Sequence, residues 1–559
     1  MDNATIAEEI ALLSKLMDIH GDNSYKARSY AHAAFQIEKL HTSLSSMAEE
    51  DIFRIKGIGE AIGKKILIRL ETGRLALLEK YLEQTPPGVL EMIQIKGLGP
   101  RKIAVIWKEL GVENLGELLY ACNENRLMLY KGFGVKTQEG IRQSIEFYMA
   151  SKGQFLYKEM EDYAAQFINY WTAVLDEKAQ IALTGDIRRQ CNILDQIALV
   201  INRPVEYVKS KLPPDYNVID TGTDNLKVKS PENIRSEIFC CPPECFALTL
   251  FRTTGSKVFM KAYMERYPDM QDKNHTAEED IFHEAGLPVI PPSIREDPNI
   301  IDEAQKGELP DLITRNDIKG IIHAHSTWSD GKNTLEEMAA AARDQGFEYL
   351  VISDHSQSAT YANGLKQDRI LAQHQQIEEL NERLFPFRIF KSIESDILSD
   401  GSLDYSDNLL RTFDLVIASI HSNLKMDEQK AMQRLLNAIT NPFTTILGHL
   451  TGRLLLSRRG YPVDHKTIID ACAAHGVAIE INAHPRRLDM DWQWIPYAMK
   501  QGVILSIDPD AHAINGINDV KYGVLSAQKG GLSADVNLSS FPLKVFESFL
   551  QKKKLKHSI

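Results

Sequence analysis

Short apolar runs alternate with helix-length segments in the C-terminal part of the chain, between residues 320 and 507. Runs of this length that are rich in β-branched residues predict strands, and the segments between them predict the crossover helices of a parallel sheet. We therefore expect a β/α barrel that begins near Asn316. The six runs occupy residues 320–322, 349–353, 387–393, 414–420, 444–448 and 503–507.

The first 150 residues show a different pattern, because their apolar positions recur with the 3.6-residue period of α-helices. One motif occurs three times there, as IKGIG at 55–59, IKGLG at 95–99 and YKGFG at 130–134. Each copy precedes a predicted helix, over residues 61–70, 100–110 and 137–148. A Gly-x-Gly turn leaves backbone N–H groups free at the start of the following helix, and such groups suit a phosphate.

Three copies of this turn resemble helix-hairpin-helix motifs, which bind the DNA backbone without reading sequence. The alternative is that the glycines only form turns between paired helices. The residues expected to contact DNA are Gly57, Gly59, Lys65, Gly97, Gly99, Lys102, Gly132 and Gly134.

Composition narrows the possible partners. A chain of 559 residues is too long for one hydrophobic core, so several domains are expected. The formal net charge of −12 excludes a general polycation, and any nucleic-acid contact must use local basic patches. The six cysteines lack zinc-ribbon spacing, and the sequence has neither a signal-peptide pattern nor an apolar stretch of about 20 residues. These features predict a soluble cytoplasmic protein with no membrane contact.

Residue types that bind transition metals follow the apolar runs. The C-terminal ends of the strands of a β/α barrel meet at one rim, so side chains distant in sequence converge there. Two histidines at i and i+2 on a strand face the same side, so His323 and His325 can bind one ion. Mixed imidazole and carboxylate ligands suit Mn²⁺, Zn²⁺ or Fe²⁺. The six histidines are His323, His325, His355, His421, His449 and His512, and Glu394 and Asp510 lie among them.

Several motifs resemble the DNA polymerase X family. Residues 23–30 (NSYKARSY) and the three glycine motifs resemble its N-terminal region. Residues 183–189 (LTGDIRR) align with its Gly-Ser-x-Arg-Arg element, and residues 254–257 (TGSK) align with its Thr-Gly-Ser turn before the thumb. The C-terminal part resembles the PHP (polymerase and histidinol phosphatase) domain that bacterial members carry.

The resemblance covers the whole chain and implies a multidomain protein of α+β and α/β class. It implies an N-terminal helical DNA-binding domain at 1–82, a helix-hairpin-helix fingers domain at 83–150, a nucleotidyltransferase-like palm at 151–252, a thumb at 253–290, a linker at 291–315 and a distorted β/α barrel, the PHP domain, at 316–559.

The palm departs from the family pattern where the family binds two Mg²⁺ ions. Two-metal nucleotidyl transfer requires three carboxylates. In the alignment the first is Asp195, the second position is Ile197 and the third is Glu237, and the spacing from the arginine pair to Asp195 is one residue shorter than in the family. Asp186 replaces the triphosphate-binding serine, although Arg188 and Arg189 are kept. We therefore expect a degenerate polymerase site that binds Mg²⁺ poorly.

The PHP signature, by contrast, is complete, and the resemblance implies up to three ions. The first would bind His323, His325, Glu394 and Asp510; the second would share Glu394 and bind His421 and His449; the third would bind Asp330, His355 and His512. Catalytic roles are expected for Glu394, Asp330, His355 and Arg453, the last as a phosphate clamp.

Such a cluster supports phosphoester hydrolysis, and in bacterial family X members the PHP domain is associated with 3′→5′ exonuclease and 3′-end processing activity. We expect a monomeric DNA-repair protein acting on gapped or nicked duplex or on 3′ ends. One alternative is an active gap-filling DNA-directed DNA polymerase with a proofreading PHP domain. Another is a DNA-binding scaffold or a small-molecule phosphatase of the histidinol-phosphate type.

Overall fold

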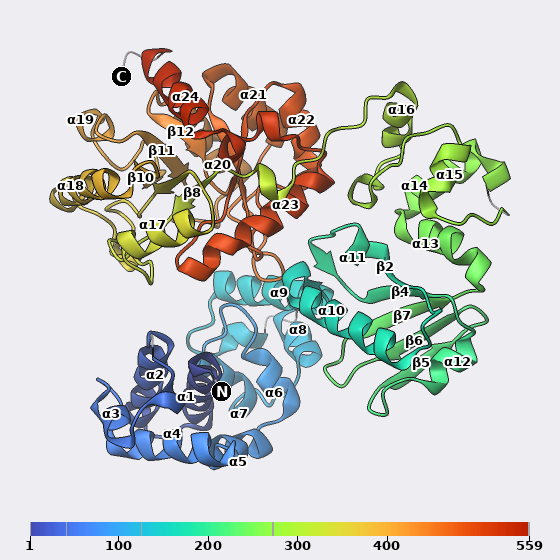
Figure 1. The fold of residues 1–559 in the computed structure, drawn as a ribbon. Coiled ribbons are helices and arrows are strands. Elements are labelled where there is room, and N and C mark those ends of the chain that lie inside the picture. The colour runs from blue at the N-terminus through green and yellow to red at the C-terminus, as the bar shows by residue number, and fades with distance from the viewer. Residues whose placement is uncertain (1, 41, 124–125, 271–272, 557–559) are drawn as a thin grey trace. The chain divides into compact units, whose positions relative to one another are not determined.

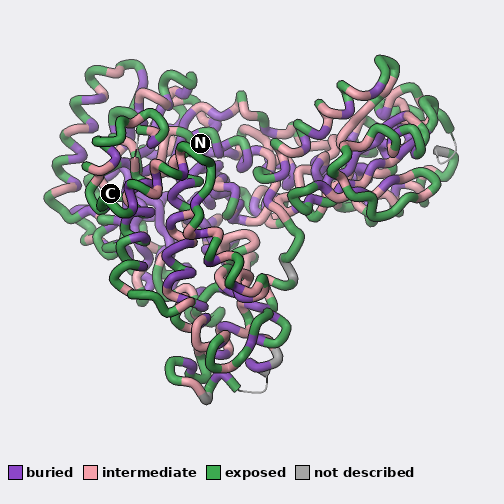
Figure 2. Tube along the Cα trace, turned by 90° about the horizontal axis from the view of Figure 1, so that it is seen from below, coloured by how far each residue is buried: buried purple, intermediate pink, exposed green. Residues whose placement is uncertain are grey.

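The computed structural model describes residues 2–40, 42–123, 126–270 and 273–556. The chain divides into two compact units, Met1–Lys152 and Gly153–Ile559 (Figure 1). Buried segments gather inside each unit and exposed segments form its outside (Figure 2). Each unit therefore has hydrophobic cores of its own.

The first unit is helical. Its first helix is capped at both ends: Asp2 accepts a hydrogen bond from Thr5 N at 2.9 Å, and Gly21 ends the helix in the left-handed conformation, with a φ of 83°. One hydrophobic cluster extends from Ile6 to Ile145. The helices are α1 Asn3–His20, α2 Ser24–Glu38, α3 Glu49–Arg54, α4 Glu60–Thr72, α5 Ala76–Gln84, α6 Pro87–Met92, α7 Pro100–Lys108, α8 Leu115–Asn123 and α9 Val135–Ser151.

The boundary expected between residues 82 and 83 falls inside helix α5, whose Leu78 and Tyr81 belong to this continuous cluster. The first unit therefore has one hydrophobic core that continues across this boundary. Apolar side chains of the later helices pack against those of the earlier ones instead.

The second unit begins with the palm, a five-stranded sheet in the order β2-β4-β7-β6-β5. Strands β4 and β7 are parallel, and the other neighbouring pairs are antiparallel. Phe167 and Trp171 of α10 pack into the same hydrophobic cluster as the buried side of the sheet. The elements are β1 Phe155–Leu156, α10 Tyr157–Val174, β2 Ile181–Thr184, α11 Gly185–Arg188, β3 Ile193–Leu194, β4 Ile197–Ile201, α12 Val205–Ser210, β5 Asn217–Thr221, β6 Asn225–Lys229 and β7 Arg235–Cys240.

The thumb is a small helical layer made of α13 Phe246–Thr254, α14 Lys257–Arg266, α15 Glu278–Glu284 and α16 Asn299–Lys306. The last of these helices lies in the stretch 291–315, which was expected to be a linker. That expectation is wrong, because Ile294, Ile300 and Ile301 belong to the same hydrophobic cluster as Phe251 and Phe282 of the thumb. The prolines of this stretch interrupt helices without removing its apolar side chains from the core.

The rest of the unit is a barrel of seven parallel strands in sequential order from β8 to β14. A bridge between Ala324 and Ala511 brings β14 beside β8, so the barrel is nearly closed. The strands are β8 Gly320–Ala324, β9 Tyr349–Ile352, β10 Arg388–Asp396, β11 Leu415–Ser419, β12 Thr444–Leu447, β13 Ala478–Asn482 and β14 Leu505–Asp508. The helices are α17 Leu335–Asp344, α18 Gln367–Leu384, α19 Asp407–Leu410, α20 Glu428–Thr440, α21 His465–His475, α22 Ile495–Lys500, α23 Val520–Lys529 and α24 Leu543–Lys556.

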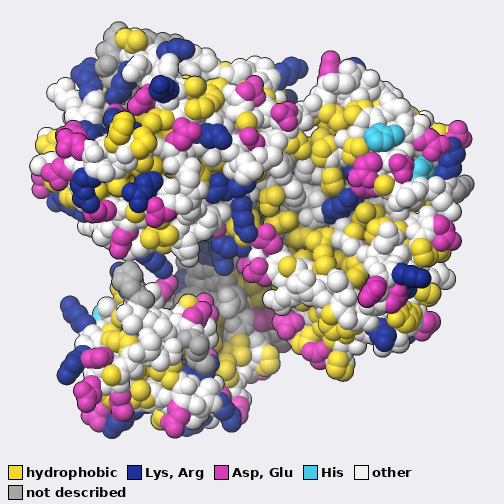
Figure 3. Space-filling model, viewed as in Figure 1, with side chains coloured by type: hydrophobic (Ala, Val, Ile, Leu, Met, Phe, Trp, Pro, Cys, Tyr) yellow, Lys and Arg dark blue, Asp and Glu magenta, His cyan; other side chains and the backbone are white. Residues whose placement is uncertain are grey.

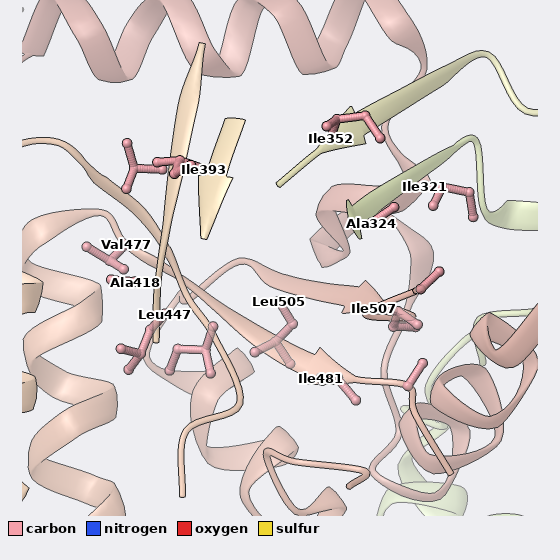
Figure 4. Packing of buried hydrophobic residues seen from close by; sticks show 14 of the residues in the cluster. Ile321, Ala324, Ile352, Ile393, Ala418, Leu447, Val477, Ile481, Leu505 and Ile507 are labelled. Atoms are coloured by element: carbon pink, nitrogen blue, oxygen red, sulfur yellow. The ribbon is translucent and has the colours of Figure 1, made fainter. Parts of the chain in front are cut away.

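Side chains alternate between the two faces of these strands, although the sequence runs are almost continuously apolar. Outward-facing residues of all seven strands pack in one cluster with the surrounding helices; Figure 4 labels Ile321, Ile352, Ile393, Leu447 and Ile481 among them. The barrel is therefore held on its outside by ordinary strand–helix packing.

The inside of the barrel is apolar at one end and polar at the other. Ile322, Val351 and Ile417 form its apolar end together with Phe546 of α24, whose ring stacks on Tyr349 at a centroid distance of 4.6 Å. The C-terminal helix thus closes the bottom of the barrel. The histidines and carboxylates described below lie at the other end, where the strands finish.

The barrel also contacts the palm within the second unit. Lys158 of α10 forms an ion pair with Asp519 at 2.9 Å, and Glu161 accepts hydrogen bonds from Lys521 at 2.8 Å and from the Tyr522 hydroxyl at 3.0 Å. These contacts join α10 to α23 and to the turn before it.

None of the helices among the described residues has both the length and the apolar composition needed to span a bilayer. On the face shown in Figure 3, basic and acidic side chains are intermingled over most of the surface. This mixture agrees with a chain in which any phosphate-binding surface is local.

Candidate functional site

An irregular strand brings the first pair of histidines into the barrel. The pairing of β8 with β9 shifts register between Ile321 and Ala324, and His323 has a φ of 61°. Asp510, just after β14, has a φ of 51°. Non-glycine residues rarely adopt this left-handed region, at a cost of about 1–3 kcal/mol, and such strain persists mainly where a functional site requires it.

All nine predicted ligands lie in one cluster where the strands end. The carboxylate of Glu394, on β10, is at its centre, 3.3 Å from His323 Nε2, 2.9 Å from His355 Nδ1 and 3.1 Å from the Nε2 atoms of His421 and His449. Three groups have ligand atoms within 4.8 Å of one another: His323, His325 and Asp510; His355, Glu394 and His421; and His325, Asp330, His355 and His512.

These groups differ in detail from the expected division into three sites. His355 belongs to two of the groups, and His449 Nε2 lies 3.2 Å from His421 Nε2. Asp330 and His512 are the outer members, with side chains that are 34% and 39% exposed, and Asp330 lies 3.5 Å from His512 Nε2. The structure thus brings the predicted residues together, and their assignment to individual ions stays a prediction.

Buried carboxylates orient the histidines from behind. Glu480, on β13, is fully buried and lies 2.5 Å from His323 Nδ1. It also accepts hydrogen bonds from His449 N at 2.9 Å and from Asn482 Nδ2 at 2.8 Å. Asp396 contacts Nδ1 of His421 in the same way. A partner on Nδ1 fixes the tautomer and leaves Nε2 facing the cluster.

Sequence reasoning missed Glu480 and the strand that carries it. Residues 477–482 (VAIEIN) form an apolar run like the six that were recognised, but a glutamate interrupts it. Alternation explains the pattern, since Ile479 and Ile481 face the helices while Glu480 faces inwards. That alternation was the signal that could have found the strand.

The charges of the cluster are strongly coupled. Burial alone would lower the pKa of His323, but the facing carboxylates of Glu480, Glu394 and Asp510 outweigh it and hold the pKa well above its usual value. Burial opposes ionisation of Glu394 as well, yet the histidines around it keep its pKa well below the usual range. Burial and two neighbouring histidines lower the pKa of His325. The cluster therefore concentrates negative charge around imidazole nitrogens.

The polar atoms of the cluster fit a bound cation. Among the described residues, His323 Nε2 and Glu394 Oε2 are buried atoms without a hydrogen-bond partner. Buried polar atoms are normally paired, so such orphans at the centre of a site call for an explanation. Imidazole and carboxylate donors at this spacing are those of a transition-metal site.

Arg453 is not placed as the expected phosphate clamp. Its guanidinium donates to the backbone oxygens of Arg487 and Leu488 and forms an ion pair with Asp491 at 2.5 Å. These bonds commit Arg453 to fixing the loop after β13. Arg487 is the arginine that faces the cluster, with Nε 3.5 Å from Asp510 Oδ2.

Of the two acidic residues that the alignment placed in the palm site, Glu237 is the one in the centre of the sheet. Glu237, on β7, pairs in register with Ala198 and contacts the side-chain amides of Gln196 at 3.1 Å and Asn225 at 2.8 Å and the ammonium of Lys227 at 3.7 Å. Ion binding there would have to displace these partners. Amide and ammonium groups take the places of further acids.

The alignment of Asp195 and Ile197 with the metal-binding pair is corrected by the structure. Ile197 is fully buried in the palm core, and Asp195 is half-exposed beside Arg235. Strand alternation places Gln196 and Ala198 on the side of Glu237 instead. The spacing that appeared one residue short in the sequence is explained by this shift.

Arg188 and Arg189 are engaged in a buried ion network that connects palm, thumb and barrel. Arg188 donates to both carboxylate oxygens of Glu278, at 2.9 and 2.6 Å, and the fully buried Arg295 donates to Glu278 at 2.6 Å. The remaining members are Arg189, which contacts Asp186 and lies 2.7 Å from Glu296, and Lys529 of α23, which also contacts Glu296. Asp186 is thus paired with one of the two arginines that the alignment matched to the family's Arg-Arg element.

The three glycine motifs have nearly identical backbones. Gly57, Gly97 and Gly132 have φ values of 91°, 91° and 96°, which favour glycine. Gly59, Gly99 and Gly134 then precede α4, α7 and α9, and none of these helices has a side-chain cap at its start. The first N–H groups of these helices, apart from Pro100 of α7, which has none, have no side-chain cap and suit a phosphate ligand.

Basic side chains accompany two of these turns. Lys65 donates to Ala61 O at 3.1 Å, and Lys102 donates to Gly97 O at 3.2 Å and lies 6.0 Å from the centre of the Phe133 ring. Lys65 also lines a surface hollow of about 630 Å³ together with Lys26 and residues 57–62. The hairpins thus combine free N–H groups with ammonium groups, as phosphate binding requires.

Comparison with known proteins gives matches over the two ends and over the whole chain. The helix-hairpin-helix domain profile matches residues 1–75, and the PHP domain profile matches residues 322–484. DNA polymerase/3'-5' exonuclease PolX of Bacillus subtilis (strain 168) is 33% identical and aligns with 99% of this chain and 100% of its own length. "Probable phosphatase Teth514_1060" of Thermoanaerobacter sp. (strain X514) is 25% identical over 42% of this chain and 94% of its own length, and "Probable phosphatase YcdX" of Escherichia coli O81 (strain ED1a) is 28% identical over 29% and 62%.

Proposed function

The chain belongs to the bacterial DNA polymerase X family whose members carry a PHP domain, and we propose that it is a DNA-repair enzyme that hydrolyses phosphodiester bonds at DNA ends, in the 3′→5′ direction, and does not polymerise. The observation that carries this proposal is the contrast between its two candidate sites. The barrel groups eight ligand-type side chains around Glu394, whereas Glu237 of the palm is surrounded by amide and ammonium groups in the part of the chain that the structure describes.

The barrel would hold up to three Mn²⁺, Zn²⁺ or Fe²⁺ ions through its nine ligands. Such ions, when bound, supply hydroxide at neutral pH and neutralise charge on the phosphate. Glu394 would be shared between ions, and Glu480 and Asp396 would fix the tautomers of His323 and His421. Arg487, beside Asp510, is placed to bind a phosphate oxygen.

The palm supports the other half of the proposal. Nucleotidyl transfer requires two metal ions and a free triphosphate site. Here amide and ammonium groups surround Glu237, and the arginine pair is engaged with Glu278, Asp186 and Glu296. The palm and thumb would then serve as structure that supports the barrel.

The hairpins favour DNA over a small molecule as the substrate. The two phosphatase relatives cover 42% and 29% of the chain, whereas the polymerase/exonuclease relative covers 99% of it and the helix-hairpin-helix profile matches residues 1–75. A gapped or nicked duplex, or a free 3′ end, would offer both a backbone for the hairpins and a terminal phosphodiester for the barrel. We propose that the protein acts on such ends as a monomer.

The test uses a 5′-labelled primer in a gapped duplex with Mn²⁺, with and without dNTPs. Shortening that is unaffected by dNTPs is expected, and efficient extension would contradict the proposal. Glu394→Ala should abolish shortening and lower the metal content more than His323→Ala does, because Glu394 contacts several histidines. Both variants should bind the duplex as the wild type does, which separates a catalytic defect from misfolding.

A further inference from the structure

An exposed aromatic side chain stands beside the histidine cluster and takes no part in it. Tyr361 is 70% exposed, and its ring centroid lies 6.1 Å from that of His355. Among the exposed large apolar side chains of the described residues, Tyr361 has a ring in contact with a histidine of the cluster. An aromatic ring with so little cover suggests that a ligand covers it.

The loop that carries Tyr361 is fixed. Ala359 and Ala362, on either side of Thr360 and Tyr361, are buried, so both ends of this short 3₁₀ turn are held in the core while Thr360 and Tyr361 face solvent. Ser358 is bonded to Asp404 at 2.6 Å and to Asp396 at 2.7 Å, and Leu365 N donates to His355 O at 2.9 Å. The ring is therefore presented from a rigid support and is not a flexible surface residue.

The far side of the loop is tied to the loop that follows the first strand of the barrel. Asn363, in the left-handed conformation, contacts the backbone oxygens of Trp328 and Ser329, both at 3.4 Å, and Arg369 donates to Asn363 O at 2.9 Å. This anchoring places Tyr361 over the segment that leads to Asp330.

The surroundings of the ring fit a base better than a phosphate. The ring of Tyr361 lies beside His355, whose Nδ1 is 2.9 Å from Glu394, so the negative charge of the cluster is close to the ring. A neutral group suits such a position. The face of the ring is neutral and open, and every nucleobase can stack on such a face.

We propose that Tyr361 is the stacking platform for the base of the 3′-terminal nucleotide, whose phosphodiester lies at the cluster. This inference rests on the proposed exonuclease function. A base can reach the ring only when it has left its pair, and unpairing is easiest at single-stranded or mismatched ends. Tyr361 would thereby make the enzyme prefer 3′ ends whose last base is unpaired.

The test compares single-stranded oligonucleotides that end in a normal or an abasic 3′ nucleotide, with the full-length Mn²⁺ enzyme. The wild type should lose roughly 5- to 150-fold in kcat/KM on the abasic end, the range expected for one stacked base. Tyr361→Ala should be slow on both ends and lose this discrimination, whereas Tyr361→Phe should keep it. Phe385→Ala is the matched control, because Phe385 is an 84% exposed aromatic residue away from the cluster.

A second readout is independent of hydrolysis. An oligonucleotide with 3′-terminal 2-aminopurine, bound to Glu394→Ala protein, should lose fluorescence through stacking, and adding Tyr361→Ala should restore it. Unchanged discrimination in Tyr361→Ala, an effect of the penultimate base instead of the last one, or equal quenching in both proteins would overturn the inference. Complete inactivity of the wild type on every oligonucleotide would instead refute the proposed function, and the quenching comparison would still decide the role of Tyr361.

Discussion

Replacing Glu480 by glutamine should weaken metal binding although Glu480 is not itself expected to bind an ion. Its Oε2 lies 2.5 Å from His323 Nδ1, and its Oε1 accepts from His449 N at 2.9 Å and from Asn482 Nδ2 at 2.8 Å. The carboxylate therefore faces three donors and offers acceptors on both sides.

A glutamine amide has one acceptor side and one donor side. If its NH₂ faces His323, the imidazole must move its proton to Nε2, and a protonated Nε2 cannot bind a metal. If its oxygen faces His323, the NH₂ opposes the His449 N–H and the Asn482 amide. At least one buried donor is then left without a partner, at a cost of about 1–3 kcal/mol. This cost agrees with the 10- to 100-fold loss in metal affinity or activity that is typical of such second-layer changes.

The assay is metal affinity by competition with a chelator, together with nuclease activity as a function of Mn²⁺ concentration. Glu480→Gln should need roughly 10- to 100-fold more metal for half-maximal activity. Glu278→Gln is the matched control, since Glu278 is also buried and hydrogen-bonded but lies in the thumb. A Glu480→Gln protein that binds metal as tightly as the wild type, while folding normally, would refute the tautomer argument.

Three further predictions concern the rest of the chain. Primer extension should be negligible in the wild type and unchanged in Glu237→Gln; efficient extension that this substitution abolishes would restore the polymerase assignment. Binding of duplex DNA should weaken steeply with salt and hardly depend on sequence, and Lys102→Ala should reduce the slope of log affinity against log salt by about 1; a slope equal to that of the wild type would exclude this lysine as a phosphate contact. Although burial opposes its ionisation, Arg188 and Arg295 keep the pKa of Glu278 below its usual 4.5, so its contribution to stability is present above about pH 4.5 and is lost as the pH falls through the folded-state pKa; hydrogen exchange of thumb amides should show this loss in the wild type and not in Glu278→Gln.

The barrel could be predicted because its strands and its ligands occur together in the sequence. Each recognised run is followed within three residues by a predicted metal ligand, so one pattern supported the other. The strand at 478–482 was missed because it lacks this combination. Its polar residue Glu480 lies inside the apolar run and is not one of the predicted metal ligands. Alternation along the strand is a weaker signal than a histidine at its end.

Side-chain partners were harder to predict than positions. Arg453 resembled a phosphate clamp because arginine suits phosphate, but its guanidinium is bonded to a loop that lies more than 30 residues further along the chain. In the palm, the alignment matched Asp195 to the first metal-binding position because Asp195 is the nearest acidic residue. The pairing of Ala198 with Glu237 shows which residues of β4 lie opposite β7. Both errors concern contacts between segments that sequence spacing does not encode.

The ion pairs of Arg188 and Arg189 bear on whether the palm can bind a nucleotide. A guanidinium that binds a triphosphate must remain free for it, yet Arg188 and Arg189 are bound to carboxylates of the palm and thumb. Removing one partner of a buried ion pair costs about 3–5 kcal/mol, because the other charge stays buried. With Arg295 fully buried beside Glu278, and Lys529 bringing the barrel into the same network, these charges now stabilise the junction of palm, thumb and barrel. Restoring the palm carboxylates alone would therefore not restore polymerisation, since a nucleotide would have to compete with that junction for its arginines.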